Sequence, residues 1–495
     1  MKLAPNPPQG NLRFVTPATA AELSRRAKAG RAVRLAPGIY VEDATLDREH
    51  AARHHLYNIV AHVWPGAVIW GRSALTGGQP EDGRLYVCLP ELGRTSDLRL
   101  PGVTVKPSVG PPALPGDMDF VSGLHVSGVA RTLIENTDVR GRRHGGRAGT
   151  PTVETRIDEL ARSGGAGRVQ NTLAQLDVIA GHFAASAVEA TRVRLAAVLG
   201  TNDAVQVQSP CLRARLAGLP YDEQRLVMLR DLVDVLEQRA PRPVPISGAA
   251  ERWNWLAFFE AYFSNFIEGT EFGVDEARAI AIDGVVPAAR PADAHDVAAT
   301  YRLAADPGER ARVPRSADGL VALLQERHEK LMAARPDKHP GEFKEVANFA
   351  GGYRFVDPTL VEGTLRHGFT IVDGLTDPFG RAVAMMLLIT EVHPFDDGNG
   401  RLARLMANSE LSVAGQVRLV IPSVYRTNYL VALTAISNRA DPGRSLIAVL
   451  EYAQRWAAAV DWTEYQQTND QLVSLHAYLD PGIADATGQR LLMPA

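Results

Sequence analysis

The chain has 495 residues, and at about 100 to 200 residues per domain this length predicts two to four domains. Its 53 Lys and Arg nearly balance 56 Asp and Glu, so the net charge of −3 gives no overall attraction to nucleic acid or to a membrane. The two cysteines, Cys88 and Cys211, are far apart in sequence, which excludes a disulfide framework and a thiolate zinc site.

The N-terminus lacks the apolar core of a secretion signal, and the longest apolar run, "AVAMMLLI" from Ala382, falls short of the roughly 18 residues that span a bilayer. We therefore expect a soluble cytoplasmic protein with no membrane partner.

The N-terminal half predicts small domains that contain strands. Residues 1–14 are rich in Pro and Asn, and we expect them to be flexible. Residues 15–60 predict a helix followed by a hairpin at Pro37-Gly38, which is the element order of a winged helix. Short strand-like runs between Gly and Pro predict a small α/β module over residues 61–139.

This half resembles the AbiEi-type antitoxins and regulators, in "AELSRRAKAGRAVRLAPGIYV", "PGAVIWGRSAL", "PGVTVKPS" and "GLHVSGVARTLIENT". The resemblance covers residues 15 to 140 and implies a DNA-binding winged helix. The residues that would then contact phosphates are Arg25, Arg26, Lys28, Arg31 and Arg34. A solvated basic helix in a protein-binding module is the alternative, because no base-reading side chains can be identified.

The C-terminal half predicts helices. Residues 140–239 form a basic loop and a helical connector, and "APRPVPISG" at 240–248 predicts an extended linker, since prolines prevent a helix. Residues 249–460 have helical apolar spacing except at 347–363, which predicts a hairpin, and residues 461–495 form a C-terminal extension. The expected fold class is a multidomain α+β protein.

The segment "HPFDDGNGRLAR" starts at His393, where an apolar helix over 379–392 ends before Pro394. The turn "GNG" at 398–400 runs into a second helix, and a glycine turn at a helix start points N–H groups and the positive end of the helix dipole at one anion. Arg401 and Arg404 share a face of that helix and suit a polyphosphate.

Two further side chains of this segment complete a site for nucleotidyl transfer. Asp397 can hold a Mg²⁺ ion that also binds phosphate oxygens. His393 titrates near neutral pH and can deprotonate an attacking hydroxyl.

The whole segment matches the signature of the Fic family, His-x-Phe-x-(Asp/Glu)-Gly-Asn-Gly-(Arg/Lys)-x-x-Arg. The resemblance implies a mainly α-helical Fic fold that transfers AMP from ATP to a Ser, Thr or Tyr hydroxyl, with a β-hairpin flap at 347–363 that aligns the target. The implied roles are general base for His393, Mg²⁺ ligand for Asp397, phosphate nest for Gly398, Asn399 and Gly400 with Asn399 at the α-phosphate, β-phosphate ligand for Arg401, γ-phosphate ligand for Arg404, and core anchor for Phe395.

The same resemblance places the nucleobase beside "YLVALTAI", with Tyr429 at the recurrent aromatic position. Where some relatives have an adenine-binding Asn, this sequence has Ser437 next to Asn438. Relatives that transfer UMP, GMP, phosphocholine or phosphate therefore remain alternatives.

A second motif, "SNFIEG", ends an upstream helix and places Ser264 and Glu268 on one face. By itself it is a helix end with Gly269 as terminator and a solvated Glu268. It also matches the Fic inhibitory motif (Ser/Thr)-x-x-x-Glu-(Gly/Asn), which implies that Glu268 pairs with Arg404 and excludes the γ-phosphate. In some relatives this Glu also positions water to remove AMP.

Two hypotheses of different class follow. The first is an autoinhibited protein AMP-transferase that uses ATP and Mg²⁺, modifies a protein target or itself, and carries a DNA-binding or targeting module. The second is a DNA-binding regulator with a catalytically silent Fic core, and the intact His393 argues against it. A homodimer is left open.

Overall fold

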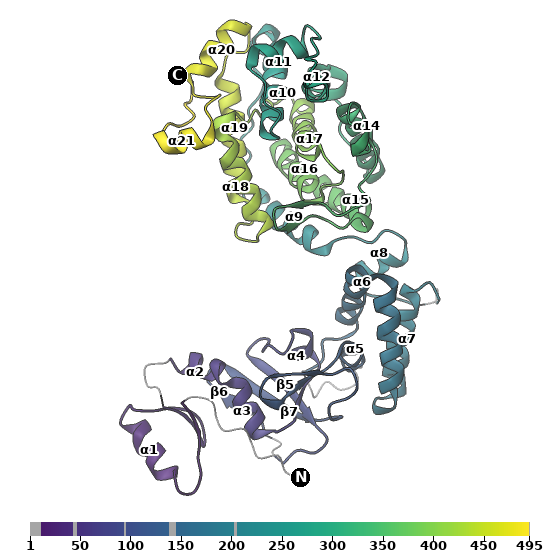
Figure 1. Cartoon of the computed structure of the whole chain (residues 1–495), viewed down its shortest axis with the longest axis vertical. Coiled ribbons are helices and arrows are strands. Elements are labelled where there is room, and N and C mark those ends of the chain that lie inside the picture. Colours follow the sequence, from purple (N-terminus) through teal and green to yellow (C-terminus); the bar gives the residue numbers. More distant parts are fainter. Residues whose placement is uncertain (1–10, 43–46, 94–95, 138–144, 202–204, 495) are drawn as a thin grey trace. The chain divides into compact units, whose positions relative to one another are not determined.

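The computed structural model describes residues 11–42, 47–93, 96–137, 145–201 and 205–494. The chain forms two compact units, Met1–Gly218 and Leu219–Ala495. Figure 1 shows strands and helices in the first unit and mainly helices in the second. Among the described residues, no helix combines the length and the apolar character needed to cross a membrane.

The first unit begins with a small antiparallel sheet around one helix. Its elements are β1 (Leu12–Phe14), α1 (Ala20–Lys28), β2 (Val33–Ala36) and β3 (Ile39–Val41), and the strand order is β1-β3-β2. The predicted hairpin at Pro37-Gly38 joins β2 and β3. Residues 1–10 of the predicted flexible N-terminus lie outside the described residues, whereas Leu12 is fully buried in β1. The winged-helix assignment stays a prediction.

A six-stranded mixed sheet follows, with order β6-β7-β5-β4-β9-β8. Its strands are β4 (Val68–Ile69), β5 (Arg84–Leu89), β6 (Leu98–Leu100), β7 (Val103–Val109), β8 (Met118–Asp119) and β9 (His125–Val126). The helices of this region are α2 (Arg48–His54), α3 (Leu56–Val63), α4 (Arg72–Leu75) and α5 (Val129–Thr137). The first unit therefore contains the predicted α/β region.

The described part of the first unit ends with the α-helices α6 (Thr150–Ile179), which is interrupted at Gly165, α7 (Ala185–Val198) and α8 (Pro210–Leu216). The predicted basic loop falls partly on residues 140–144, which lie outside the described residues.

The second unit is a helical bundle with one small hairpin. Its helices are α9 (Glu223–Glu237), α10 (Leu256–Ile267), α11 (Val274–Ala281), α12 (Pro291–Ala305), α13 (Pro307–Arg310), α14 (Ala317–Met332), α15 (Val361–Asp373), α16 (Pro378–Val392), α17 (Asn399–Val413), α18 (Arg426–Ser437), α19 (Arg444–Ala459), α20 (Tyr465–Ser474) and α21 (Pro481–Thr487). The apolar helix α16 lies at its centre and packs against α9, α15 and α17.

The boundary between the units differs from the predicted linker at 240–248. Helix α9 precedes that stretch but belongs to the second unit, because Leu229 and Leu232 are buried in the same core as α16. The proline-rich stretch lies along the second unit, where the Ile246 N–H donates to the Gly415 carbonyl at 2.9 Å. A proline run prevents a helix, but it does not prevent an extended segment from packing.

The predicted strand- and turn-like segment contains a two-stranded hairpin, β10 (Phe349–Ala350) and β11 (Tyr353–Arg354). The end of that segment, 361–363, is already the first turn of α15. We call residues 349–354 the flap hairpin.

Candidate active site

Helix α16 delivers His393 to the site. The Asp377 carboxylate caps the start of the helix by accepting the Gly380 N–H at 3.0 Å. The helix ends at His393, which has left-handed backbone angles (φ 51°), and Pro394 cannot continue it. A non-glycine residue in this conformation is strained, so the surrounding structure holds it there.

The imidazole of His393 lies between Phe355, which follows the flap hairpin, and the end of α16. Its ring stacks on Phe355 with 3.9 Å between centroids, and Nδ1 lies 3.2 Å from the Thr390 carbonyl oxygen. Because a carbonyl only accepts, Nδ1 carries the proton and Nε2 is left as the basic atom. Burial lowers the pKa of His393 to about 4, since the imidazolium loses its hydration; the Thr390 carbonyl acts in the opposite direction.

The loop after His393 is held by its own side chains. Asn399 bonds to the backbone of Phe395 at both ends, accepting its N–H at 3.0 Å and donating to its carbonyl at 2.8 Å. The ring of Phe395 is fully buried and stacks on His328 at 3.7 Å. Phe395 thus lies in the core as expected, and the side chain of Asn399 stabilises the loop.

The glycines place the start of α17 against its neighbours. Gly398 has φ 76°, and a Cβ there would lie 2.9 Å from the Met332 sulfur. A Cβ on Gly400 would lie 2.1 Å from Oε1 of Glu268. The Glu268 carboxylate therefore occupies the N-terminal turn of α17, where backbone N–H groups and the helix dipole favour an anion.

The same carboxylate contacts Arg404. Nη2 of Arg404 lies 2.7 Å from Oε1 of Glu268 and donates to the Ser264 carbonyl at 2.8 Å, while its Nε donates to Ser264 Oγ at 2.9 Å. The structure thus brings together Ser264, Glu268 and Arg404. It also shows Gly269 with φ 84° after Glu268, as a helix terminator.

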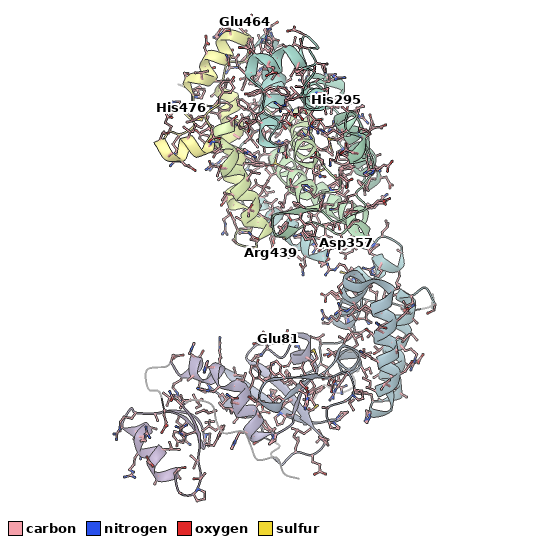
Figure 2. All side chains as sticks on the ribbon, viewed as in Figure 1. Glu81, His295, Asp357, Arg439, Glu464 and His476 are labelled. Carbon is pink, nitrogen blue, oxygen red and sulfur yellow. The ribbon has the colours of Figure 1, made fainter. Side chains whose placement is uncertain are left out.

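Arg401 is held by an acid that the sequence did not reveal. Its Nη1 lies 2.8 Å from Oδ2 of Asp296 on α12, and both side chains are almost fully buried. The same Oδ2 lies 2.9 Å from Nη2 of Arg335. Asp296 lies next to His295, which is labelled in Figure 2. It precedes Arg401 by more than 100 positions, so no sequence spacing links Asp296 with Arg401.

We predict that Asp296→Asn lowers the free energy of unfolding by about 3–5 kcal/mol, because the buried guanidinium of Arg401 loses its carboxylate partner and Arg335 keeps only Asp293. Urea unfolding would measure it. The matched control is Asp293→Asn on the same helix, whose side chain is 28% exposed, with an expected loss of about 1 kcal/mol or less. Equal losses for the two variants would contradict the assignment.

The remaining predicted residues lie near the loop. The Asp397 carboxylate is 47% exposed, accepts the Gly398 N–H at 2.6 Å and lies 3.9 Å from Arg401. Tyr429 is buried on α18, with its hydroxyl 3.5 Å from the Met386 sulfur.

Ser437, at the expected nucleobase-binding position, donates its hydroxyl proton to Glu391 at 2.6 Å. Glu391 also accepts the Tyr353 hydroxyl of the flap hairpin at 2.5 Å, so this buried carboxylate ties α18 to the flap hairpin.

The residues predicted to contact DNA phosphates differ in whether they are exposed or paired. Arg26 pairs with Glu42 at 2.6 Å, whereas Arg25, Lys28, Arg31 and Arg34 are exposed.

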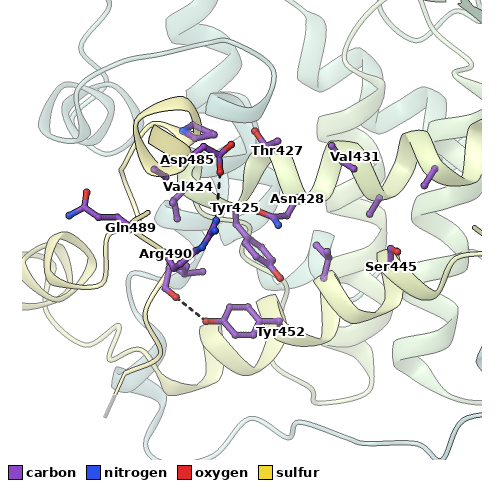
Figure 3. A pocket seen from close by; sticks show the side chains of 16 residues that line it. Val424, Tyr425, Thr427, Asn428, Val431, Ser445, Tyr452, Asp485, Gln489 and Arg490 are labelled. Carbon is purple, nitrogen blue, oxygen red and sulfur yellow. Dashed lines mark hydrogen bonds and ion pairs between the residues drawn. The ribbon is translucent and has the colours of Figure 1, made fainter. Parts of the chain in front are cut away.

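A cavity of about 660 Å³ lies between α18, α19 and α21. Figure 3 shows Asn428, Tyr452 and Arg490 around it. None of the residues predicted for the catalytic, nucleotide-binding or inhibitory site lines this cavity, so it is separate from the loop at His393.

The chain is similar to known proteins over part of its length. Residues 320–411 match the Fic/DOC family. Protein adenylyltransferase fic-1 of Caenorhabditis elegans is 26% identical over 184 residues, 36% of this chain and 36% of that protein. Protein adenylyltransferase Fic of Drosophila melanogaster is 26% identical over 216 residues, 42% of each chain. The chain therefore spans about two fifths of the length of the curated relatives it matches.

Two solved structures are similar at low TM-score. Fic-1 (aa134–508) of C. elegans has 18% identity and a TM-score of 0.36, covering 66% of this chain and 98% of that one. A Fic domain containing signaling protein of Bacteroides thetaiotaomicron has 22% identity and a TM-score of 0.36, covering 49% and 99%. The match to the Fic/DOC family over residues 320–411 includes His393, Asp397, Arg401 and Arg404.

Proposed function

We propose that the protein transfers AMP from ATP to a Ser, Thr or Tyr hydroxyl of a protein target, which includes itself. The observation that carries this proposal is the meeting of a neutral imidazole, a glycine-lined helix N-terminus and Arg404 at one turn between α16 and α17. The names of the curated relatives, protein adenylyltransferases, support it.

In the proposed step the target hydroxyl oxygen forms a bond to the α-phosphorus, and its proton passes to Nε2 of His393. The bond from the α-phosphorus to the β-phosphate oxygen breaks, and pyrophosphate leaves. The N-terminal turn of α17 would hold the phosphates together with Arg401 and Arg404, since fixed donors stabilise charge without reorganising.

Magnesium fits the proposed site. The described residues contain no cluster of three or more His, Cys, Asp or Glu for a metal. Mg²⁺ needs no such cluster, because it is commonly bound by one or two carboxylates together with substrate phosphates and water. The half-exposed carboxylate of Asp397 would hold it, and the ion would neutralise phosphate charge.

We further propose that the enzyme is autoinhibited. Glu268 places one negative charge in the N-terminal turn of α17 and binds Arg404, so a γ-phosphate must displace it. The same carboxylate is a candidate for orienting a water molecule that removes AMP. Release of AMP from the modified protein by wild type, but not by a Glu268 variant, would test this second activity.

Incubation with ATP, GTP, UTP or CDP-choline followed by intact-mass spectrometry tests the donor, because the added mass identifies the transferred group. We expect AMP. The other donors are included because Glu391 binds Ser437, the residue at the expected nucleobase position. A carboxylate there accepts N–H groups of a base and repels its acceptor atoms, so it affects which base binds.

The rate should depend little on pH between 6 and 8. Because burial lowers the pKa of His393 to about 4, the base is already unprotonated throughout that range, and the acid limb of kcat/KM is expected below pH 5. An unperturbed histidine would lose about fourfold in rate from pH 8 to pH 6. A half-maximal rate near pH 6.5 would contradict the buried imidazole.

A second candidate function is DNA binding by the first unit, as in a regulator with a silent Fic core. The observation in its favour is the exposure of Arg25, Arg31 and Arg34 around α1 and β2. Binding of the full chain to duplex DNA should then weaken steeply with salt, and the triple Ala variant should reduce the slope. AMP transfer by the protein would exclude the silent core, and a salt-independent signal would exclude phosphate contacts.

A further inference from the structure

Two residues before the flap hairpin bind the whole turn that carries His393, with three hydrogen bonds from their side chains and one from the Lys344 backbone N–H. The carbonyl oxygens of residues 392–395 each accept a hydrogen bond from Lys344 or Asn348. The bonds are Lys344 Nζ to Val392 at 3.2 Å, Asn348 Nδ2 to His393 at 3.3 Å, Lys344 N to Pro394 at 2.9 Å and Asn348 Nδ2 to Phe395 at 2.9 Å. Four consecutive carbonyls are thus satisfied from one short segment.

Lys344 and Asn348 also bind each other, since Nζ of Lys344 donates to Oδ1 of Asn348 at 2.7 Å. Lys344 is 4% exposed, and its amine donates to uncharged oxygens of Asn348 and Val392. Burial lowers its pKa to about 7. Lysines are rarely buried this deeply, and although the charges of Asp357 and Asp396 favour its protonated form, the hydrogen bonds of this amine go to Asn348 and to the turn.

The same segment connects the turn to the ring that covers His393. The backbone carbonyl of Asn348 accepts the N–H of Phe355 at 3.2 Å, and the ring of Phe355 stacks on the imidazole of His393. Asn348 therefore fixes both the backbone of His393 and its stacking partner. Without these donors the strained left-handed backbone of His393 would be free to relax.

We propose that Lys344 and Asn348 are positioning residues for His393, holding its backbone and ring so that Nε2 faces the target hydroxyl. The proposal rests on the proposed function. A shift of about 1 Å in a reacting group can cost on the order of a hundredfold in rate, so these contacts matter for kcat.

The test uses Lys344→Met and Asn348→Asp in the full chain carrying Glu268→Gly. Met removes the amine and keeps the stem, while Asp keeps the acceptor for Lys344 and removes both donor bonds to the turn. We expect kcat to fall about 10- to 100-fold and the KM for ATP to change less than about twofold, because Lys344 and Asn348 bind residues 392–395, which precede α17. Lys338→Met, at a 40% exposed lysine of the preceding segment, is the matched control and should keep the parent kcat.

A second readout needs no activity. Stacking on Phe355 displaces the ring proton signals of His393 in the NMR spectrum, and His393→Ala assigns them. Those signals should move toward the free-histidine position in Asn348→Asp and stay in place in Lys338→Met. If Lys344→Met does not fold, Asn348→Asp carries the test.

The outcomes distinguish a failure of the proposed function from a failure of the positioning role. An inactive Glu268→Gly parent refutes the proposed function, and the His393 signals then decide the positioning role alone. An active parent with unchanged kcat and unchanged His393 signals in Asn348→Asp overturns the positioning role. Equal losses of kcat and ATP affinity overturn it too, because they indicate a general structural effect.

Discussion

Glu268→Gly is expected to raise auto-AMPylation in the presence of ATP and Mg²⁺ by about tenfold or more, which corresponds to ~1.4 kcal/mol of transition-state stabilisation. The substitution empties the N-terminal turn of α17 and releases Nη2 of Arg404 from a contact at 2.7 Å. The guanidinium and the helix N-terminus then become available to the phosphates together. Incorporation of labelled AMP measures the change.

The matched control is Glu271→Gly, which makes the same substitution at an exposed residue of the following loop. Glu271 uses its backbone carbonyl to accept from Arg290, and that contact survives the substitution. The control should keep the wild-type rate. Equal incorporation of AMP by wild type and Glu268→Gly would remove the inhibitory role from Glu268.

His393→Ala is expected to lower AMP transfer by about 10²- to 10⁴-fold in the Glu268→Gly background, the range typical of a lost general base. The affinity for ATP should change little, because the groups proposed to hold the phosphates lie at the start of α17. Single-turnover transfer and ATP binding by calorimetry separate the two effects.

A suitable control is His339→Ala, at an exposed histidine whose ring lies 2.8 Å from Asp396 in the same loop. It should keep most of the activity. Transfer by His393→Ala at the parent rate would mean that another group takes the proton, and the neutral imidazole between Phe355 and Thr390 would then lack a catalytic role.

Local chemistry made the elements around the site predictable from sequence. The apolar run before His393 predicted a helix that the structure shows as α16, and the glycine turn predicted the start of α17. The predicted hairpin is present as β10 and β11. These features depend on neighbours in sequence, through apolar spacing, proline geometry and glycine turns.

Domain limits and several partners were not predictable in this way. The proline-rich stretch 240–248 predicted a linker, yet it packs along the second unit, because backbone pairing with Gly415 depends on a distant segment. The partner of Arg401 was missed for the same reason, since a buried Asp on a distant helix leaves no local pattern.

The sequence by itself determined the chemical groups available: a histidine after an apolar helix, a glycine turn into a helix, two arginines on one face and a Glu at an upstream helix end. Only the tertiary structure decided their partners. It placed Glu268 against Gly400 and Arg404, gave Arg401 to Asp296, and bound the turn of His393 to Lys344 and Asn348. The physical reason is that a buried charge or carbonyl must find a counterpart wherever the packed helices bring one near, at any separation along the chain.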